Sequence, residues 1–275
     1  MAWILIISCL FFLWIFSLCK ILIPSSSPLR NSFLKAGVHE KRNVLLVIAH
    51  PDDESMFFTP TINFLTSRGH NLHILCLSVG NADGKGDTRK RELYQACAVL
   101  KVPIQQVKTL DHPDLQDGFG ELWNHSLLAK IIEDEIISHS INLIITFDNY
   151  GVSGHCNHRD VHHGVCKLIY DTSQRDVEAW ELVSTNILRK YSGPVDIWFS
   201  VLGVMQHSSG RMHCLVNEHC RRSFLAMAQH KSQWVWFRKL FVALSSYTYM
   251  NTLRKIKLGA CEVTAPHNYM ACEIN

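Results

Sequence analysis

The residues best suited to chemistry lie in two short stretches that are far apart in the chain. The first, AHPDDE, contains His50, Asp52 and Asp53, and the second, HCNH, contains His155 and His158. Imidazole and carboxylate groups are the usual ligands of catalytic zinc sites, which use three protein ligands and leave one position for water. The two stretches together predict a metal-dependent hydrolytic site.

The spacing suggests a role for each of these residues. We expect His50, Asp53 and His158 to bind the metal, because a tight turn between a strand and a helix can direct His50 and Asp53 toward one point. Asp52 would then be free to accept a proton from water. His155 would stabilise or protonate a tetrahedral intermediate. This division of roles predicts hydrolysis of an amide or an ester.

Each residue also has a simpler interpretation. Acidic side chains are common at the start of a helix, where they favour the positive end of the helix dipole, and this alone could explain DDE. The histidines of HCNH could be surface residues among the 16 in the chain, and the overlapping stretch HRDVHH adds His162 and His163 as further candidates. Spacing alone leaves these alternatives open.

From residue 43 onward, apolar runs of strand length alternate with segments of helical periodicity. We expect strands at 43–50, 71–79, 107–110 and 141–148, and helices at 53–70, 88–100 and 121–140. This order predicts an α/β fold with a Rossmann-like, mostly parallel sheet flanked by helices. Polar loops follow all four strands, at the edge where such sheets bind ligands. Neither GxGxxG nor GxxxxGK[ST] occurs, so a nucleotide-binding function loses its main support.

The amino-terminal stretch is apolar. Residues 2–23 contain one charge, Lys20, and approach the roughly 20 residues that a membrane-spanning helix needs. A cleaved signal peptide is the alternative, but this run is long, lacks a basic flank before it and lacks a clear cleavage site. Basic residues follow the run, which places the globular part in the cytosol. We expect a transmembrane anchor at 1–23 and a linker at 24–42.

Composition restricts the class of partner and the compartment. A chain of 275 residues that is 47% hydrophobic can bury a full core. The net charge is +3 and the basic residues are scattered, so nucleic acid is not an expected partner. Ten cysteines occur without a CxxC pair, which favours buried thiols in a reducing compartment. A glycan on the Asn124 sequon would contradict the cytosolic orientation.

The two motifs AHPDDE and GVSGHCNH resemble the LmbE-like family of zinc-dependent de-N-acetylases. The likeness extends over residues 43–251 through TRKREL, NILRKY and HKSQWVWFRKL, so the deacetylase domain is expected there and residues 252–275 form a tail of uncertain structure. By motif position the resemblance implies that His50, Asp53 and His158 bind the metal and that Asp52 is the general base. It also implies that His155 assists at the tetrahedral intermediate. It also implies that Arg89 contacts substrate, since a guanidinium group binds phosphate oxygens well.

Within this family the chain is most like the members that act on a membrane glycolipid. The resemblance implies removal of acetate from N-acetylglucosaminyl-phosphatidylinositol, the second step of glycosylphosphatidylinositol anchor synthesis, at the cytosolic face of the endoplasmic reticulum. A soluble N-acetylglucosaminyl conjugate is an alternative substrate, and a non-catalytic scaffold is an alternative function. Asn157 departs from the aspartate of many bacterial relatives. Residues 233–250 form either a buried helix or a contact with the membrane interface.

Overall fold

The computed structural model describes residues 2–22, 33, 41–118, 120–171, 177–206 and 210–257. Within these residues, seven strands form one sheet in the order β3-β2-β1-β4-β5-β7-β6. The strands are β1 (Asn43–Ile48), β2 (Asn71–Cys76), β3 (Val107–Thr109), β4 (Leu143–Phe147), β5 (Glu178–Leu182), β6 (Met212–Val216) and β7 (Met250–Lys255). The first five in spatial order are parallel, and β7 is antiparallel to both β5 and β6.

The centre of the sheet is formed by continuous apolar runs. Strand β1 lies between β2 and β4, with Leu46 opposite Ile74 on one side and Ile145 on the other. All three side chains are buried. A parallel strand covered on both faces has no solvent-facing side, so its sequence is apolar throughout rather than alternating. The expected α/β fold with a mostly parallel sheet is confirmed.

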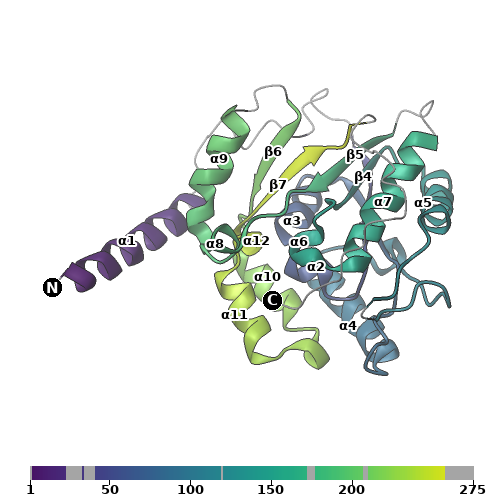
Figure 1. Cartoon of the computed structure of the whole chain (residues 1–275), viewed down its shortest axis with the longest axis horizontal. Helices are drawn as coiled ribbons and strands as arrows, with labels where there is room; N and C mark the ends of the chain where they lie inside the picture. The colour runs from purple at the N-terminus through teal and green to yellow at the C-terminus, as the bar shows by residue number, and fades with distance from the viewer. Residues whose placement is uncertain are drawn as a thin grey trace.

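Helices cover both faces of this sheet (Figure 1). On one face, α5 and α7 pack against Leu45, Val47 and Ile144. On the other face, α3, α4, α10 and α12 pack against Leu46 and Ile48. The longer helices are α3 (Thr59–Ser67), α4 (Gly86–Val99), α5 (His125–His139), α7 (Cys156–Asp171), α9 (Asp196–Gln206), α10 (Cys220–Met227) and α11 (Trp236–Leu244). The short helices are α2 (Asp53–Met56), α6 (Gly151–Gly154), α8 (Ile187–Lys190), α12 (Ser246–Tyr249), η2 (Ile104–Gln106), η3 (Gly193–Val195) and η4 (Lys231–Gln233).

Two expectations about the boundaries of elements were wrong. The helix expected over residues 53–70 is divided into α2 and α3, because Phe57 and Phe58 both turn into the core and Pro60 favours a new helix start. Strand β7 continues to Lys255, past the expected end of the domain at residue 251, because these residues pair with β5 and β6. The rest of the expected tail, 258–275, and most of the linker lie outside the described residues.

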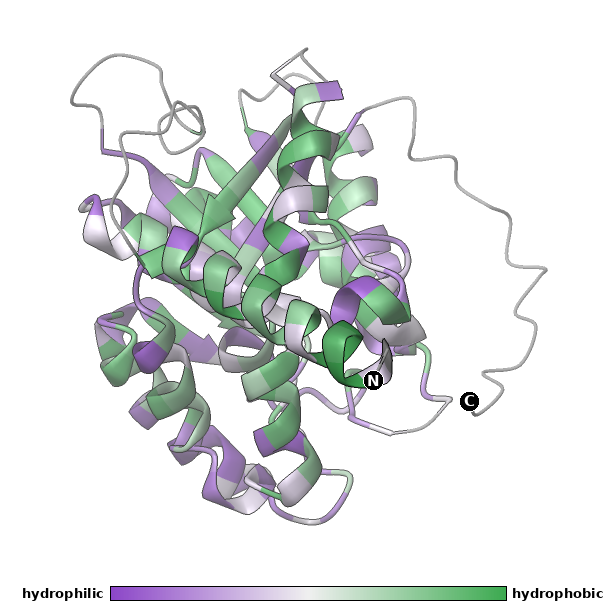
Figure 2. Cartoon of the chain, turned by 90° about the vertical axis from the view of Figure 1, so that its left-hand side faces the viewer, coloured by the Kyte–Doolittle hydropathy of each residue, from purple (hydrophilic) through white to green (hydrophobic). Residues whose placement is uncertain are grey.

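Helix α1 (Ala2–Leu22) is the one described helix that is long and apolar enough to cross a membrane. It projects from the globular part (Figure 1), and in Figure 2 it points toward the viewer and is coloured as apolar along most of its length. Its carboxyl-terminal half packs against the domain. Trp198 Nε1 donates a hydrogen bond of 2.9 Å to Ser17 Oγ, the ring of Trp14 meets that of Tyr249, and Ile21 is fully buried.

Candidate metal centre

Loops that follow the parallel strands β1, β3 and β4 meet at the carboxyl end of the sheet. His50 Nε2, after β1, lies 3.2 Å from Asp117 Oδ1, after β3. His158 Nε2, after β4, lies 3.2 Å from Oδ1 of Asp53. All of these side chains except that of Asp117 are almost completely buried. The predicted site residues of the two motifs therefore converge, as the topology of a parallel sheet requires.

The Asp53 carboxylate is held in place by the backbone that precedes it. Its Oδ2 accepts hydrogen bonds from the Ala49 and His50 amides at 3.1 and 2.8 Å. Burial opposes its charge, but the nearby imidazoles of His158 and His50 outweigh this and hold the pKa of Asp53 below its usual value. Asp53 is therefore an ionised carboxylate of fixed orientation, and not only a helix-start acid.

Hydrogen-bond partners determine which nitrogen of His50 carries the proton. Its Nε2 faces two acceptors, Asn157 Oδ1 and Asp117 Oδ1, each at 3.2 Å. Since neither acceptor can donate, Nε2 must carry a hydrogen and the lone pair of a neutral ring lies on Nδ1. Nδ1 lies 3.8 Å from Asp53 Oδ2. Asn157 thus orients His50 as an acceptor, and its amide nitrogen is satisfied by the Glu121 carbonyl at 3.0 Å.

The same reasoning applies to His158. Its Nδ1 lies 3.1 Å from the carbonyl oxygen of Gly151, so Nδ1 donates and the lone pair of the neutral ring is on Nε2, facing Asp53. Gly151 has φ 58°, and a Cβ there would lie 2.9 Å from His158 Cβ. Asp148 holds this turn by accepting from the Gly151 amide at 3.2 Å. The ring of His158 also stacks on Phe147 at 4.0 Å.

These donors fit a divalent metal ion. One nitrogen of each imidazole, the one that carries the lone pair when the ring is neutral, faces the same carboxylate, with separations of 3.2 and 3.8 Å from Asp53 oxygens. Metal–ligand distances near 2.1 Å in a tetrahedral site separate neighbouring ligand atoms by about 3.4 Å. Nitrogen atoms of His50, His155 and His158 also lie within 4.8 Å of one another. His50 and His158 belong to both possible sets, so Asp53 as the third ligand stays a prediction.

His155 lies at the exposed side of this cluster. Its ring is 4.8 Å from that of His50 and 4.7 Å from that of His158. Loss of solvent around the ring, and then the charges of these two neighbours, lower the pKa of His155 to about 4. His155 is therefore neutral near pH 7, and a neutral imidazole can still donate a hydrogen bond from its N–H group.

The candidates His162 and His163 lie outside this cluster. His162 Nδ1 faces the Phe147 carbonyl at 3.0 Å, and burial together with the charge of His163 lowers the pKa of His162 to about 4. The ring of His163 lies 5.2 Å from that of His125. Both side chains therefore pack within and beside α7, and away from the two motifs.

Asp52 lies beside the cluster in a strained conformation. It has φ 122°, in the region that favours glycine. Its Oδ2 contacts two guanidinium groups, that of Arg89 at 3.5 Å and that of Arg238 on α11. Strain at a residue of an active site persists only where the surroundings hold it, and here the Glu54 carboxylate accepts from the Asp52 amide at 3.1 Å.

Arg89 lies at the site, but its guanidinium group is already bonded to hydrogen-bond acceptors of the protein itself. Nη1 donates to the Gly80 carbonyl at 2.9 Å and to Asp117 at 3.2 Å, and Nη2 donates to the Pro51 carbonyl at 2.9 Å. A Cβ on Gly80 would lie 2.5 Å from this guanidinium. Arg89 therefore links the loops after β1, β2 and β3. Its contact with substrate stays a prediction.

Sequence reasoning missed four residues of this site. Glu54 and His230 form a pair at 2.6 Å in which neither side chain is exposed. Asp117 orients His50, and burial of its carboxylate is outweighed by His50 and Arg89, which lower the pKa of Asp117. Arg238 reaches Asp52 from α11. The signals available were the acidic loop DHPDLQDGFG and the family-like stretch HKSQWVWFRKL, which contain Asp117, His230 and Arg238.

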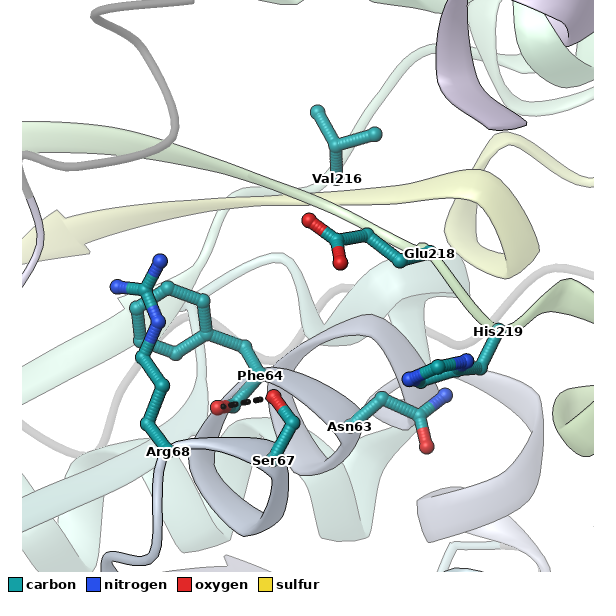
Figure 3. Close-up of a pocket in the computed structure, with 7 residues that line it drawn as sticks. All are labelled: Asn63, Phe64, Ser67, Arg68, Val216, Glu218 and His219. Carbon is teal, nitrogen blue, oxygen red and sulfur yellow. Dashed lines mark hydrogen bonds between the residues drawn. The ribbon is translucent and has the colours of Figure 1, made fainter. Parts of the chain in front are cut away.

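A concavity lies away from the metal centre. It is the pocket drawn in Figure 3, between α3 and the residues that follow β6, and it is lined by Asn63, Phe64, Ser67, Arg68, Val216, Glu218 and His219. Ser67 Oγ donates to the Phe64 carbonyl of its own helix at 3.0 Å, and the Arg68 guanidinium covers the Phe64 ring at 4.0 Å. This pocket contains none of the predicted site residues.

Comparison with known proteins identifies a family. Residues 45–169 match the family described as PIG-L: GlcNAc-PI de-N-acetylase. The chain is 40% identical over 219 residues to a probable N-acetylglucosaminyl-phosphatidylinositol de-N-acetylase of Schizosaccharomyces pombe, covering 78% of this chain and 86% of the relative. It is 36% identical over 210 residues to the N-acetylglucosaminyl-phosphatidylinositol de-N-acetylase of Bos taurus, covering 76% of this chain and 81% of the relative.

A solved structure shares the fold at low sequence identity. The N,N'-diacetylchitobiose deacetylase from Pyrococcus horikoshii superposes with a TM-score of 0.59 at 14% identity, covering 91% of this chain and 93% of that protein. This likeness concerns the arrangement of strands and helices. It is consistent with the mostly parallel sheet flanked by helices.

Proposed function

The chain belongs to the PIG-L family of de-N-acetylases, and we propose that it hydrolyses the acetamide of N-acetylglucosaminyl-phosphatidylinositol to glucosaminyl-phosphatidylinositol and acetate. This is the second step of glycosylphosphatidylinositol anchor synthesis. The arrangement of His50 and His158 around the Asp53 carboxylate, with Asp52 adjacent, supports this activity most directly. A non-catalytic scaffold has no need of two imidazole rings gathered around one buried carboxylate.

We assign the metal to His50, Asp53 and His158, and we propose Zn²⁺ as the ion. Imidazole nitrogen and carboxylate oxygen suit zinc, although other divalent ions accept the same donors. When bound, the ion would act as a Lewis acid and lower the pKa of a water molecule. The hydrogen bonds from His50 to Asn157 and from His158 to Gly151 would keep both rings in the ligating orientation.

Asp52 and His155 assist the reaction by proton transfer and by hydrogen bonding. Asp52 accepts a proton from the attacking water and can return it to the amide nitrogen, so that the amine leaves in a neutral form. His155, which is neutral because its pKa is about 4, donates a hydrogen bond to the oxygen of the acetamide carbonyl as negative charge develops there. Arg89 and Arg238 both contact Oδ2 of Asp52, so the proton transfer from water is assigned to its other carboxylate oxygen, Oδ1.

We propose that the protein is anchored in the endoplasmic reticulum membrane by α1, in a single pass, with the catalytic domain in the cytosol. The length and apolarity of α1 support the anchor. The basic residues that follow it support this orientation. Cys76, Cys97 and Cys214 are buried free thiols, in keeping with a reducing compartment. Trp236, Phe237 and Leu240 on α11 are exposed and supply an apolar surface suited to the membrane interface.

Acetate release by the full chain in detergent micelles tests the function. The unaltered protein should release acetate from N-acetylglucosaminyl-phosphatidylinositol, and this activity should be lost with a chelator and return when Zn²⁺ is added back. Activity that survives complete removal of metal would refute the metal mechanism. Preference for a soluble N-acetylglucosaminyl conjugate over the glycolipid would refute the proposed substrate.

A further inference from the structure

Helix α11 presents one basic side chain to the candidate metal centre. Arg238 Nη1 contacts Asp52 Oδ2, although the two residues are 186 positions apart in the chain. Phe241 and Val242, which share the helix face of Arg238, are buried, whereas Trp236 is 72% exposed. The inner face of α11 therefore lies toward the site, and Arg238 brings a positive charge to the predicted general base.

The two arginines on Asp52 differ in what else they contact. Arg89 donates to two backbone carbonyls and to Asp117, so its guanidinium keeps three acceptors without Asp52. Among the described residues, Asp52 is the acceptor found for Arg238. The Arg238 side chain is also more accessible, at 24% exposed against 10% for Arg89. Arg238 is thus the arginine that can exchange a protein partner for a ligand.

We propose that Arg238 binds the phosphodiester group of the glycolipid and releases Asp52 when substrate enters. This rests on the proposed function, which makes the glycolipid the substrate and Asp52 the general base. A guanidinium group that leaves a carboxylate in a partly buried site needs another anion, because an unpaired charge there is costly. Phosphate oxygens match the guanidinium fork. The exposed apolar residues on the outer face of α11 would place Arg238 near the depth of a lipid headgroup.

The prediction concerns the substrate for which an Arg238 variant loses affinity. Arg238→Ala is compared with Lys239→Ala, its exposed neighbour, whose Nζ lies 5.6 Å from the Trp234 ring. Each full-length variant is assayed on N-acetylglucosaminyl-phosphatidylinositol and on N-acetylglucosaminyl-inositol, which lacks the phosphate. Arg238→Ala should lower kcat/KM for the phosphodiester about 10- to 100-fold, mainly through KM, as expected for a lost charged hydrogen bond. The phosphate-free compound offers Arg238 no anion to bind, so its turnover should not fall in Arg238→Ala, and Lys239→Ala should leave both activities unchanged.

Other outcomes would overturn the assignment. An equal loss on both substrates would mean that Arg238 acts only by positioning Asp52, and no loss on either would mean that it does not bind phosphate. Should Arg238→Ala fail to fold, Arg238→Lys keeps the charge and removes the fork, and the same selective loss, of smaller size, is required. Acetate release from neither compound by the unaltered chain would overturn the proposed function itself, together with this role of Arg238.

Discussion

The pair formed by Glu54 and His230 gives a sharp test of how this site is held together. The two side chains are joined at 2.6 Å and neither is exposed to solvent. Glu54 also accepts from Ser55 Oγ at 2.6 Å and from the Asp52 amide at 3.1 Å. His230→Ala would therefore leave a buried carboxylate with its hydrogen bonds but without its charged partner.

The expected loss is large relative to the whole stability of a domain. Removing one member of a buried ion pair costs about 3–5 kcal/mol, and a typical domain is stable by roughly 5–15 kcal/mol. The double variant Glu54→Gln with His230→Ala should regain part of the loss, because no unpaired charge is then buried. Since Glu54 holds the Asp52 amide, His230→Ala should also lower turnover.

Unfolding of the full chain in detergent micelles, followed by near-ultraviolet circular dichroism, measures this loss. Lys167→Ala is a suitable control, because Lys167 pairs at 3.1 Å with Asp171 on the surface of α7 and both side chains are exposed. That change should cost less than about 0.5 kcal/mol. A free energy of unfolding for His230→Ala within about 1 kcal/mol of the unaltered chain would refute the assignment of this pair as a major stabilising contact.

The same pair predicts a direction of pH dependence. Burial opposes the charge of His230, but Glu54 outweighs this effect and raises the pKa of His230 above its ordinary value of 6.5. A raised folded-state pKa means that the pair contributes fully below pH 6.5 and that its contribution is lost as the pH rises through the folded value. The stability difference between the unaltered chain and His230→Gln should therefore narrow with rising pH. A difference that widens would contradict this reasoning.

Four further substitutions test the remaining assignments. Asp52→Asn should keep the bound metal, measured by elemental analysis, while kcat falls about 10²- to 10⁴-fold through loss of the general base. His158→Ala should lose the metal and His155→Gln should retain it, whereas metal loss in both would make His155 a ligand. Trp236→Asp should reduce turnover of glycolipid in vesicles but not of a soluble analogue, because a charge opposes insertion of α11 into the interface.

Much of the fold followed from local patterns. The buried strands β1, β2 and β4 were visible as apolar runs, because a strand covered on both faces cannot alternate. The site at the carboxyl ends of these strands followed from the topology that they imply. The break between Phe57 and Phe58 was not visible, since helical periodicity continues across it and only packing directs both rings into the core.

The candidate site was also partly evident before its structure. AHPDDE and HCNH contain His50, Asp53 and His158, and neighbouring parallel strands bring their loops together whatever the intervening sequence. The chemical types of the site residues could therefore be predicted from these two local motifs. Only the folded chain decided which nitrogen of each ring faces Asp53, because the deciding acceptors, Asn157 and the Gly151 carbonyl, act through distance and direction.

The contacts of Asp52 and Glu54 depended on tertiary structure alone. Arg238 and His230 lie in a stretch where basic and aromatic residues alternate without a periodic pattern that distinguishes them. Packing of α10 against α2, and of α11 against α10, brings His230 to Glu54 and Arg238 to Asp52, over separations of 176 and 186 positions in the chain. Sequence periodicity reports which face of an element is buried, whereas ion pairs between distant elements depend on how those faces are finally packed.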